Sequence, residues 1–519
     1  MPENPSPRVT LPQFPESLWL AASPIPSFPK LTRDIRVDAA VVGAGISGIT
    51  TAYLLSQRGL RVALIEAGTV LSGTTGHTTA KITAQHDLVY DEFISHFGKE
   101  QARLYYEANH EALQFIKKTV AEQRIACDFT EEDAYVYTDA DDYVKKIASE
   151  YAAYEALGIP GAYADRTPLP FPTKAAVVMK QQARFNPVPY LTHLLRQATE
   201  QYGCQVYEHS TAVNLEKGSP ATVITQEGQR VTCDFVVLST HFPFADGGGF
   251  YFAKLHASRS YVLAAKAAQA WPGGMYICAE EPKRSLRSAT VNGEALLLIG
   301  GESHKTGQGL CTFRHYEALQ QFGEEQLGIT DIRYRWSAQD LVTLDKLPYI
   351  GPITSDALNV FVATGYKKWG MTTGTAAALL IDKLVAGGES PYQELFHPSR
   401  FHADPSLKTL IVQNADVLDQ FVSGKLEMIF KTPEELDRDE GSVVRVNGKR
   451  AGAYRDPEGT LHIVDTTCTH MGCEVEWNDG ERTWDCPCHG SRFSYKGDVL
   501  EGPAKEPLAE LAAPEGVER

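Results

Sequence analysis

The sequence predicts a mixed α/β protein with a small all-β domain near its C-terminal end. Three observations support this fold class. A glycine-rich βαβ unit lies near the N-terminus, helix and strand patterns alternate through the middle, and short strands with tight turns follow residue 432. At 519 residues, 43% of them hydrophobic, the chain is too long for one core and has enough apolar residues for several. We therefore expect at least two domains.

Composition excludes several classes of function. The net charge of −16 and the scattered Lys and Arg residues argue against a nucleic-acid partner. The longest apolar stretch, residues 375–388, is interrupted by Asp382 and Lys383, so no membrane span is expected. The first thirty residues lack the pattern of a secretory signal. A cytoplasmic protein is predicted.

The first element is the βαβ unit, with a strand within 37–45, a helix within 47–59 and a second strand within 60–68. Its turn carries three glycines and its second strand ends in an acid, a pattern typical of dinucleotide binding. One glycine makes the tight turn, the next admits the phosphates, the third lets helix and strand pack, and the acid holds a ribose hydroxyl. These residues are Gly43, Gly45, Gly48 and Glu66.

The later elements extend this unit into a larger α/β body. Helical periodicity returns in residues 99–123 and 188–203, a strand is predicted at 205–209, and a final strand and helix are predicted at 357–365 and 371–387. Residues 442–464 then read as strands joined by the turn signals NG and DPEG. The predicted organisation is an N-terminal extension (1–34), a body with interleaved cofactor and substrate portions (35–402), a connecting segment (403–431), a β domain (432–510) and a tail (511–519).

Residues 35 to 390 resemble the glycine oxidase, sarcosine oxidase and dimethylglycine oxidase family of flavoproteins. The resemblance rests on GAGISG, SGTTGHTTAK, ARFNPVPYL and the late segment LPYIGPITSDALNVFVATGYKKWGMTTG. It implies FAD as the cofactor and a D-amino-acid oxidase-like fold. It also places the late segment beneath the flavin, which implicates Gly365, Gly370, Met371 and Thr372. No second βαβ fingerprint is present, so a nicotinamide cofactor has little support.

Two residues near the predicted flavin each leave two interpretations open. In the dimethylglycine oxidase branch, a His in a context similar to GTTGHT bonds covalently to the flavin, which makes His77 a candidate anchor. Alternatively, His77 only forms hydrogen bonds near the flavin ring. Lys81 matches a basic position of the family and either holds the negative charge of reduced flavin or is a solvated lysine.

Four of the nine cysteines cluster within CTHMGC and CPCHGSRF, where each of two loops offers one Cys and one His. A Cys2His2 zinc site is the alternative, but zinc fingers usually pair Cys with Cys along the chain. The two loops, with GSRF and EGPAKEP, resemble the Rieske family, which implies a 2Fe-2S cluster held by Cys468, His470, Cys486 and His489.

The Rieske resemblance assigns four further residues. It implies a disulfide between Cys473 and Cys488 and a hydroxyl of Ser491 that donates to cluster sulfur. Phe493 stands where the cytochrome type has a Tyr, so one potential-raising hydrogen bond is in doubt. The other five cysteines are interpreted as buried or idle thiols.

A mononuclear iron site of the Rieske oxygenase type is a competing interpretation. Glu394, His397 and His402 have a suggestive spacing for two His and one carboxylate. Pro398 interrupts the helix that such ligands usually share, and the β domain follows this segment instead of preceding it. The flavoprotein resemblance accounts for the rest of the chain.

Together the resemblances imply an oxidoreductase acting on CH–NH or CH–NH2 groups. An amine or amino-acid-like substrate would transfer hydride to FAD, and the cluster would pass the electrons to an external acceptor. The alternatives are an oxidase that reduces O2 and keeps a regulatory cluster, and a non-enzymatic electron carrier. Candidate catalytic residues are Lys81, Arg259, Tyr261 and His304. The sequence indicates neither the substrate, nor the acceptor, nor the oligomeric state.

Overall fold

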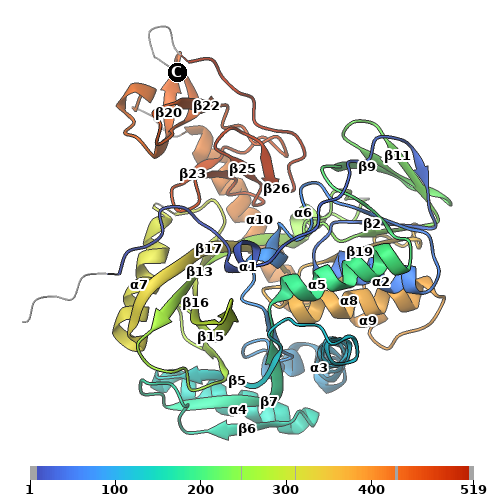
Figure 1. Cartoon of the computed structure of the whole chain (residues 1–519), viewed down its shortest axis with the longest axis vertical. Coiled ribbons are helices and arrows are strands. Elements are labelled where there is room, and N and C mark those ends of the chain that lie inside the picture. The colour runs from blue at the N-terminus through green and yellow to red at the C-terminus, as the bar shows by residue number, and fades with distance from the viewer. Residues whose placement is uncertain (1–8, 247, 310, 427–430, 514–519) are drawn as a thin grey trace, which may run out of the picture.

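A computed structural model describes residues 9–246, 248–309, 311–426 and 431–513. Residues 1–8 of the predicted extension and 514–519 of the predicted tail lie outside the described residues. The α/β body carries the C-terminal β domain on one end (Figure 1). The predicted fold class is confirmed, with three sheets in the body and two in the β domain among the described residues.

The βαβ unit belongs to a six-stranded sheet in the order β18-β19-β12-β2-β3-β8. All neighbours are parallel except β18 and β19. The strands are β2 (Ala39–Val42), β3 (Val62–Ile65), β8 (Gln205–Tyr207), β12 (Phe235–Leu238), β18 (Tyr349–Pro352) and β19 (Val360–Thr364). Strands β2 and β3 are buried along their whole length, as apolar parallel strands covered on both faces should be.

Helices α2 (Ile46–Gln57), α5 (Pro187–Arg196) and α8 (Gly370–Val385) pack beside this sheet (Figure 1). Asn186 caps α5, because its side chain accepts a hydrogen bond from Val188 N. A π-helical turn, Gln197–Gln201, extends α5, and the short α9 (Gln393–Phe396) follows α8. The helices predicted within 47–59, 188–203 and 371–387 are therefore present.

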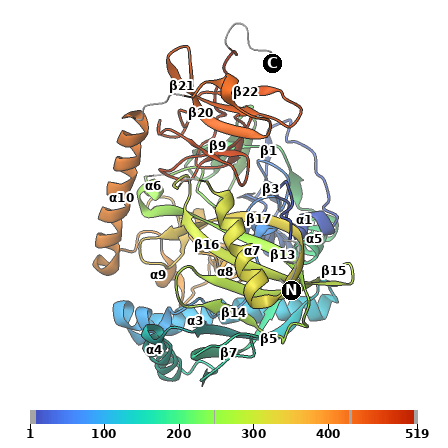
Figure 2. The same cartoon turned by 90° about the vertical axis from the view of Figure 1, so that its left-hand side faces the viewer.

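A nine-stranded mixed sheet forms the second layer of the body, in the order β17-β13-β16-β15-β14-β5-β7-β4 with β6 paired to β7. Its strands are β4 (Lys81–Ile82), β5 (Thr130–Thr138), β6 (Gly161–Ala164), β7 (Ala175–Arg184), β13 (Leu255–Ala267), β14 (Met275–Cys278), β15 (Arg284–Val291), β16 (Glu294–Lys305) and β17 (Ile329–Thr343). Helices α4 (Asp141–Leu157) and α7 (Phe313–Leu327) pack on it (Figure 2), and α3 (Tyr90–Gln123, kinked at Gly98) lies between α4 and α8. Because β4 and β5 precede β12, this layer is interleaved with the first along the chain.

A small sheet, β1-β11-β10-β9, flanks the body. Its strands are β1 (Ile35–Arg36), β9 (Ala212–Glu216), β10 (Ala221–Thr225) and β11 (Arg230–Cys233), while α1 (Leu18–Ala22) and α6 (Tyr251–Lys254) are short helices. Leu18 and Trp19 of α1 are fully buried in the main core. The described part of the N-terminal extension is thus packed onto the body.

The predicted connecting segment contains a long helix, α10 (Ala403–Leu426), on the outer side of the molecule (Figure 2). The β domain follows, with sheets β20-β21-β22 and β23-β24-β25-β26. Its strands are β20 (Glu440–Val446), β21 (Lys449–Arg455), β22 (Leu461–Val464), β23 (Glu476–Asn478), β24 (Thr483–Asp485), β25 (Arg492–Ser494) and β26 (Val499–Glu501), after the 3-10 turn Pro433–Glu435. Trp484 fills the core of this domain and is fully buried.

The β domain docks on the body through a polar seam that also includes the N-terminal segment. The buried Arg335 of β17 donates to Gly480 O of the β domain at 2.7 Å and to Pro12 O and Gln13 O at 2.7 and 2.6 Å. Thr312 Oγ1 contacts Asp479 Oδ1 at 2.6 Å and accepts from Gly480 N at 3.0 Å. In the part of the chain that the structure describes, no helix has both the length and the apolar character to cross a membrane.

Candidate functional site

The turn between β2 and α2 is built for a close ligand. Gly43 has φ +99°, a conformation that L side chains rarely adopt, and a Cβ there would clash with Ser239 O. A Cβ at Gly48 would clash with Gly43 O, so α2 could not approach β2 as it does. Gly45 lines the cavity described below, where a Cβ would lie 3.0 Å from Thr75 Oγ1. The three glycines thus do what the dinucleotide pattern requires.

Glu66 directly follows β3, and its carboxylate is held by backbone amides. Oε2 accepts from Ala44 N at 2.7 Å and Oε1 accepts from Gly68 N at 2.9 Å. Burial raises the pKa of Glu66, and the hydrogen bonds that its carboxylate accepts from backbone N–H groups oppose that rise. The carboxylate is therefore fixed at the cavity wall, at the position predicted for a ribose contact.

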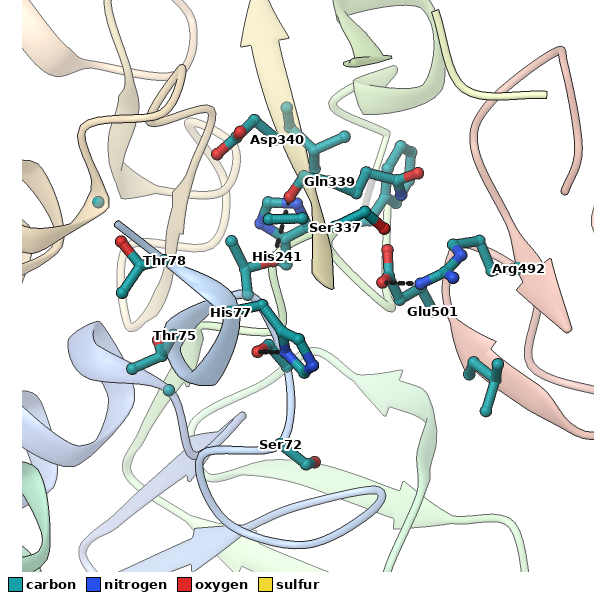
Figure 3. Close-up of a pocket in the computed structure, with 18 of the residues that line it drawn as sticks. Ser72, Thr75, His77, Thr78, His241, Ser337, Gln339, Asp340, Arg492 and Glu501 are labelled. Carbon is teal, nitrogen blue, oxygen red and sulfur yellow. Dashed lines mark hydrogen bonds and ion pairs between the residues drawn. The ribbon is translucent and has the colours of Figure 1, made fainter. Parts of the chain in front are cut away.

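A single cavity of about 1180 Å³ extends from this turn between the two layers and up to the β domain. Figure 3 shows side chains from several segments converging on it. The sequence predictions that line it are Gly45, Glu66, His77, Lys81, Tyr261, Gly370 and Met371. A cavity of this size, with the glycine turn and the Glu66 carboxylate in its wall, fits an FAD molecule.

His77 lines the cavity from the 3-10 turn Thr74–His77. Its Nδ1 lies 2.9 Å from Gly73 O, so Nδ1 carries the hydrogen and donates it. The lone pair is then on Nε2. Burial lowers the pKa of His77, which keeps the ring neutral. Trp336 Nε1 donates to His77 O at 2.7 Å and fixes the backbone.

Lys81 also lines the cavity, and its side chain is tied to the nine-stranded sheet. Nζ donates to Tyr276 O at 2.9 Å and to Ser285 Oγ at 2.7 Å. Burial holds the pKa of Lys81 well below its usual value. A solvated surface lysine is therefore not what the structure shows, and a role toward the flavin stays a prediction.

The four residues predicted from the late glycine segment do not all lie at the cavity. Gly370 and Met371, at the start of α8, line the cavity, whereas Gly365 and Thr372 do not. Gly365 has φ +79° and packs against Thr343, and Thr372 Oγ1 donates to Thr83 O at 2.9 Å. Gly365 and Thr372 therefore contact other parts of the body and not the cavity.

A group of charged residues that the sequence analysis did not single out lines the cavity beside the nine-stranded sheet: Asp87, Glu281, Lys283, Lys367 and Lys368. Lys283 Nζ pairs with Asp87 at 2.8 Å. Burial lowers the pKa of Lys367 to about 8. Lys367 and Lys368 lie in GYKKWG, inside the segment that carries the flavoprotein resemblance. That position in the sequence could have indicated that these two lysines lie at the cavity.

Arg259, Tyr261 and His304 lie near one another, but not as a group facing the cavity. The Tyr261 hydroxyl oxygen lies 3.0 Å from His304 Nε2. The Tyr261 ring stacks on His304 and on His315 of α7. Arg259 and His304 are not among the described residues that line the cavity. A catalytic role for these three residues stays a prediction, and the contacts favour a structural one.

Arg259 is instead fully buried in a network of charges that joins the two domains. It donates to Ser337 Oγ at 2.8 Å and lies 3.5 Å from Glu501 of β26. Glu501 in turn accepts from Arg492 at 2.7 Å. Burial raises the pKa of Glu501, but Arg492 and Arg259 outweigh this and lower it to about 2. Arg492 and Glu501 also line the cavity (Figure 3).

The predicted cluster ligands converge from two loops, one after β22 and one between β24 and β25. The His470 and His489 rings are 5.0 Å apart at nearly right angles, and both Nδ1 atoms are buried without a hydrogen-bond partner. The Cys468 and Cys486 thiols interact with each other, and this interaction lowers the pKa of Cys468. Two thiols and two orphaned imidazole nitrogens in one buried place fit a 2Fe-2S cluster.

The surroundings of these loops match the Rieske predictions. Cys473 and Cys488 form a disulfide, as predicted, and their sulfurs lie within 4.8 Å of Cys486 Sγ. Ser491 hydrogen bonds to Cys468 and accepts from Ala504 N at 3.0 Å. Phe493 is fully buried in the same core.

The competing iron ligands make separate contacts. His402 Nδ1 lies 3.3 Å from Asp345 Oδ2, and His397 Nδ1 accepts from Ser399 N at 3.1 Å. Asp345 is already paired with Arg400 at 2.8 Å. Their arrangement adds nothing in favour of a mononuclear iron site.

Comparison with known proteins matches two parts of the chain to two families. Residues 38–384 match the family described as FAD dependent oxidoreductase, and residues 427–512 match the Rieske [2Fe-2S] domain. The Rieske 2Fe-2S iron-sulfur protein YhfW of Bacillus subtilis is 51% identical over 499 residues, covering 96% of this chain and 98% of YhfW.

Two more distant similarities cover the body. Gamma-glutamylputrescine oxidoreductase of Escherichia coli is 22% identical over 373 residues, covering 69% of this chain and 86% of that protein. The crystal structure of glycine oxidase from Geobacillus kaustophilus superposes with a TM-score of 0.60 at 19% identity, covering 70% of this chain and 99% of that one.

Proposed function

The chain belongs to the FAD dependent oxidoreductase family and ends in a Rieske [2Fe-2S] domain, and from this premise we propose that it is an amine or amino-acid dehydrogenase. The two cofactors are FAD and a 2Fe-2S cluster. When bound, FAD takes two electrons from a C–H bond beside nitrogen, and the cluster relays electrons singly. We propose that they leave through the cluster to an external acceptor.

One observation carries this proposal. The cavity that contains the βαβ turn is also lined by Arg492 and Glu501, which belong to the β domain and are close in sequence to the cluster loop of Cys486–Ser491. Gln339 links that loop to the cavity wall, because its Nε2 donates to Gly490 O at 2.9 Å. A cluster held this close to the flavin cavity favours direct exchange of electrons between the two centres.

The residues that would hold the cofactors follow from the site. We propose that Gly43, Gly45, Gly48 and Glu66 hold the dinucleotide, with Gly370 and Met371 against the ring. The four cluster ligands are Cys468, His470, Cys486 and His489. Lys81, fixed to Tyr276 O and Ser285 Oγ, would place a donor at the flavin edge.

The charges of the cavity support an amino-acid-like substrate over a simple amine. A carboxylate needs a cation, and Lys367 lines the cavity with no side-chain partner among the described residues. An ammonium needs an acid, and Asp87 and Glu281 line the same cavity. We propose that Lys367 binds the substrate carboxylate and that these acids stand near the amino group.

The test is an anaerobic titration of the loaded protein with a panel of amino acids and amines. A substrate should bleach the flavin absorbance and then reduce the cluster. Cys468→Ser should remove the cluster, leave flavin bleaching intact and abolish turnover with a one-electron acceptor. Cys311→Ser, which alters an exposed free cysteine, should behave like the parent protein.

Other outcomes would favour the two alternatives. Full turnover of Cys468→Ser with every acceptor would make the protein an oxidase with a regulatory cluster. Absence of bleaching by the whole panel, with ready reduction by a protein partner, would make it an electron carrier. The cytoplasmic location expected from the sequence stays a prediction.

A further inference from the structure

One wall of the FAD cavity is supplied by the C-terminal domain. Residues 499–507, which we call the strap, comprise β26 and the loop after it. Seven residues of the strap from Val499 to Lys505 line the cavity in succession, and Pro507 follows. Strand β26 ends at Glu501 and the chain bends at Gly502 and Pro503, so the strap forms a continuous part of the cavity wall that changes direction after the strand.

The first end of the strap is anchored near His77. Glu501 pairs with Arg492 at 2.7 Å and lies 3.5 Å from the buried Arg259 of the body. The charge of Glu501 also acts on the His77 ring, and both residues line the cavity (Figure 3). This end therefore lies where the flavin ring is expected.

The second end is anchored near Glu66. Lys505 Nζ donates to Val213 O at 2.7 Å, and Glu506 accepts from Gln226 at 3.2 Å. Val213 follows closely on Ser210, whose backbone N donates to Glu66 O at 2.9 Å. Gln226 lines the cavity as well. This end therefore lies where the ribose is expected.

From these two anchors we infer that the Rieske domain is part of the FAD site, and that the strap retains FAD by closing the cavity along its length. A ligand that contacts only the docked arrangement stabilises it, so FAD binding and docking of the domain are coupled. Contacts that dock the domain outside the cavity, such as Thr312 with Asp479 and Gly480, then hold FAD indirectly.

This inference goes beyond the proposed function, because it needs only FAD binding and holds whatever the substrate and acceptor are. Its direct test is hydrogen–deuterium exchange of the 499–507 amides in the full chain with and without FAD. His77→Ala is used throughout, so that FAD can be removed. Exchange in the strap should slow when FAD is added. Equal exchange in the two forms would overturn the inference.

A second test follows release of FAD by the rise of its fluorescence after dilution. Lys505→Met removes a charged anchor and should speed release about tenfold, as expected for a charge-assisted hydrogen bond. Thr312→Val, outside the cavity, should also speed release. The matched controls Lys180→Met, in an exposed pair with Asp133, and Thr222→Val, buried in the small sheet, should release FAD at the parent rate.

Cluster absorbance establishes that each variant retains a folded Rieske domain. With the cluster intact, release from Lys505→Met and Thr312→Val at the parent rate would overturn the inference. No substrate or acceptor is added, so failure of this test does not bear on the proposed dehydrogenase activity. Likewise, failure to find a substrate does not bear on the role of the strap in holding FAD.

Discussion

Gln339 Nε2 donates a hydrogen bond to the carbonyl oxygen of Gly490 at 2.9 Å. The same side chain accepts from Arg259 at 3.3 Å, and the backbone oxygen of Gln339 accepts from Thr74 at 3.1 Å. Gly490 immediately follows His489, the proposed cluster ligand, and Thr74 lines the cavity proposed for FAD. One buried residue thus joins the two redox sites.

Gln339→Met should destabilise the docked protein by about 2 kcal/mol or more, because Gly490 O and Arg259 would lose a buried partner. Thermal loss of the cluster absorbance measures this change. Gln321→Met, on the exposed face of α7, should change stability by less than about 0.5 kcal/mol. Equal midpoints for Gln339→Met and the parent protein would show that this bond does not hold the domain.

If His77 anchors FAD, acid-precipitated protein should keep its yellow colour, and His77→Ala should release FAD on denaturation. The hydrogen bond from Nδ1 to Gly73 O leaves the Nε2 lone pair available for such a bond, and equally for a hydrogen bond to the flavin. The flavin absorbance of the pellet and of the supernatant measures how much FAD stays bound to the protein and how much is released. Flavin lost freely from the parent protein would leave His77 as a hydrogen-bonding residue only.

Ser491→Ala should lower the reduction potential of the cluster, since the hydroxyl bonds to the sulfur of Cys468. Phe493→Tyr should raise it by adding a second donor. The parent value should fall within about −150 to +300 mV, below the upper end. A redox titration followed by circular dichroism measures all three, with Ser494→Ala as the control. An unchanged potential in Phe493→Tyr would mean that this side chain does not reach cluster sulfur.

Cys473 and Cys488 should resist alkylation in denatured, oxidised protein until reductant is added, whereas the free, exposed Cys311 should label at once. Replacing both with Ala should cost about 3 kcal/mol, the value for a loop of some 15 residues. Mass spectrometry of labelled peptides distinguishes the outcomes. Labelling of both cysteines before reduction would disprove the bridge in the isolated protein.

Affinity for a carboxylate-bearing substrate should fall as pH rises above about 8. Burial lowers the pKa of Lys367 to about 8, so its positive charge is present below that pH and lost above it. Anaerobic substrate binding across pH 7 to 10 measures the effect. Lys367→Met should bind weakly with no step near pH 8. An amine without a carboxylate should lose affinity in both proteins only as its own ammonium deprotonates, at about pH 10. A step that survives in Lys367→Met would assign it to another group.

Prediction from sequence succeeded where the chemistry is local. The βαβ turn and the two cluster loops place their residues within short segments, so the spacing of Gly43, Gly45 and Gly48, or of Cys486 and His489, carries the geometry. The helix α2 and the strand β19 follow from apolar periodicity for the same reason.

Prediction was incomplete where the partners are far apart in the chain. Arg259 pairs with Glu501, 242 residues away, and no periodicity indicates such a contact. Lys367 and Lys368 both have positive φ, 44° and 71°, which the surrounding fold imposes and which no propensity predicts for lysine. The helix α10 begins among prolines and serines, yet Val417 and Phe421 pack against the β domain core.

The contacts of Arg335 impose an order on the making of this protein. Its guanidinium binds backbone oxygens of residues 12 and 13 on one side and of Gly480 on the other. During synthesis the N-terminal segment and β17 leave the ribosome long before residue 480 exists, and domains generally fold as they emerge. The nascent body therefore folds with two of these three Arg335 hydrogen bonds available, and a product that stops short of residue 480 lacks the third acceptor.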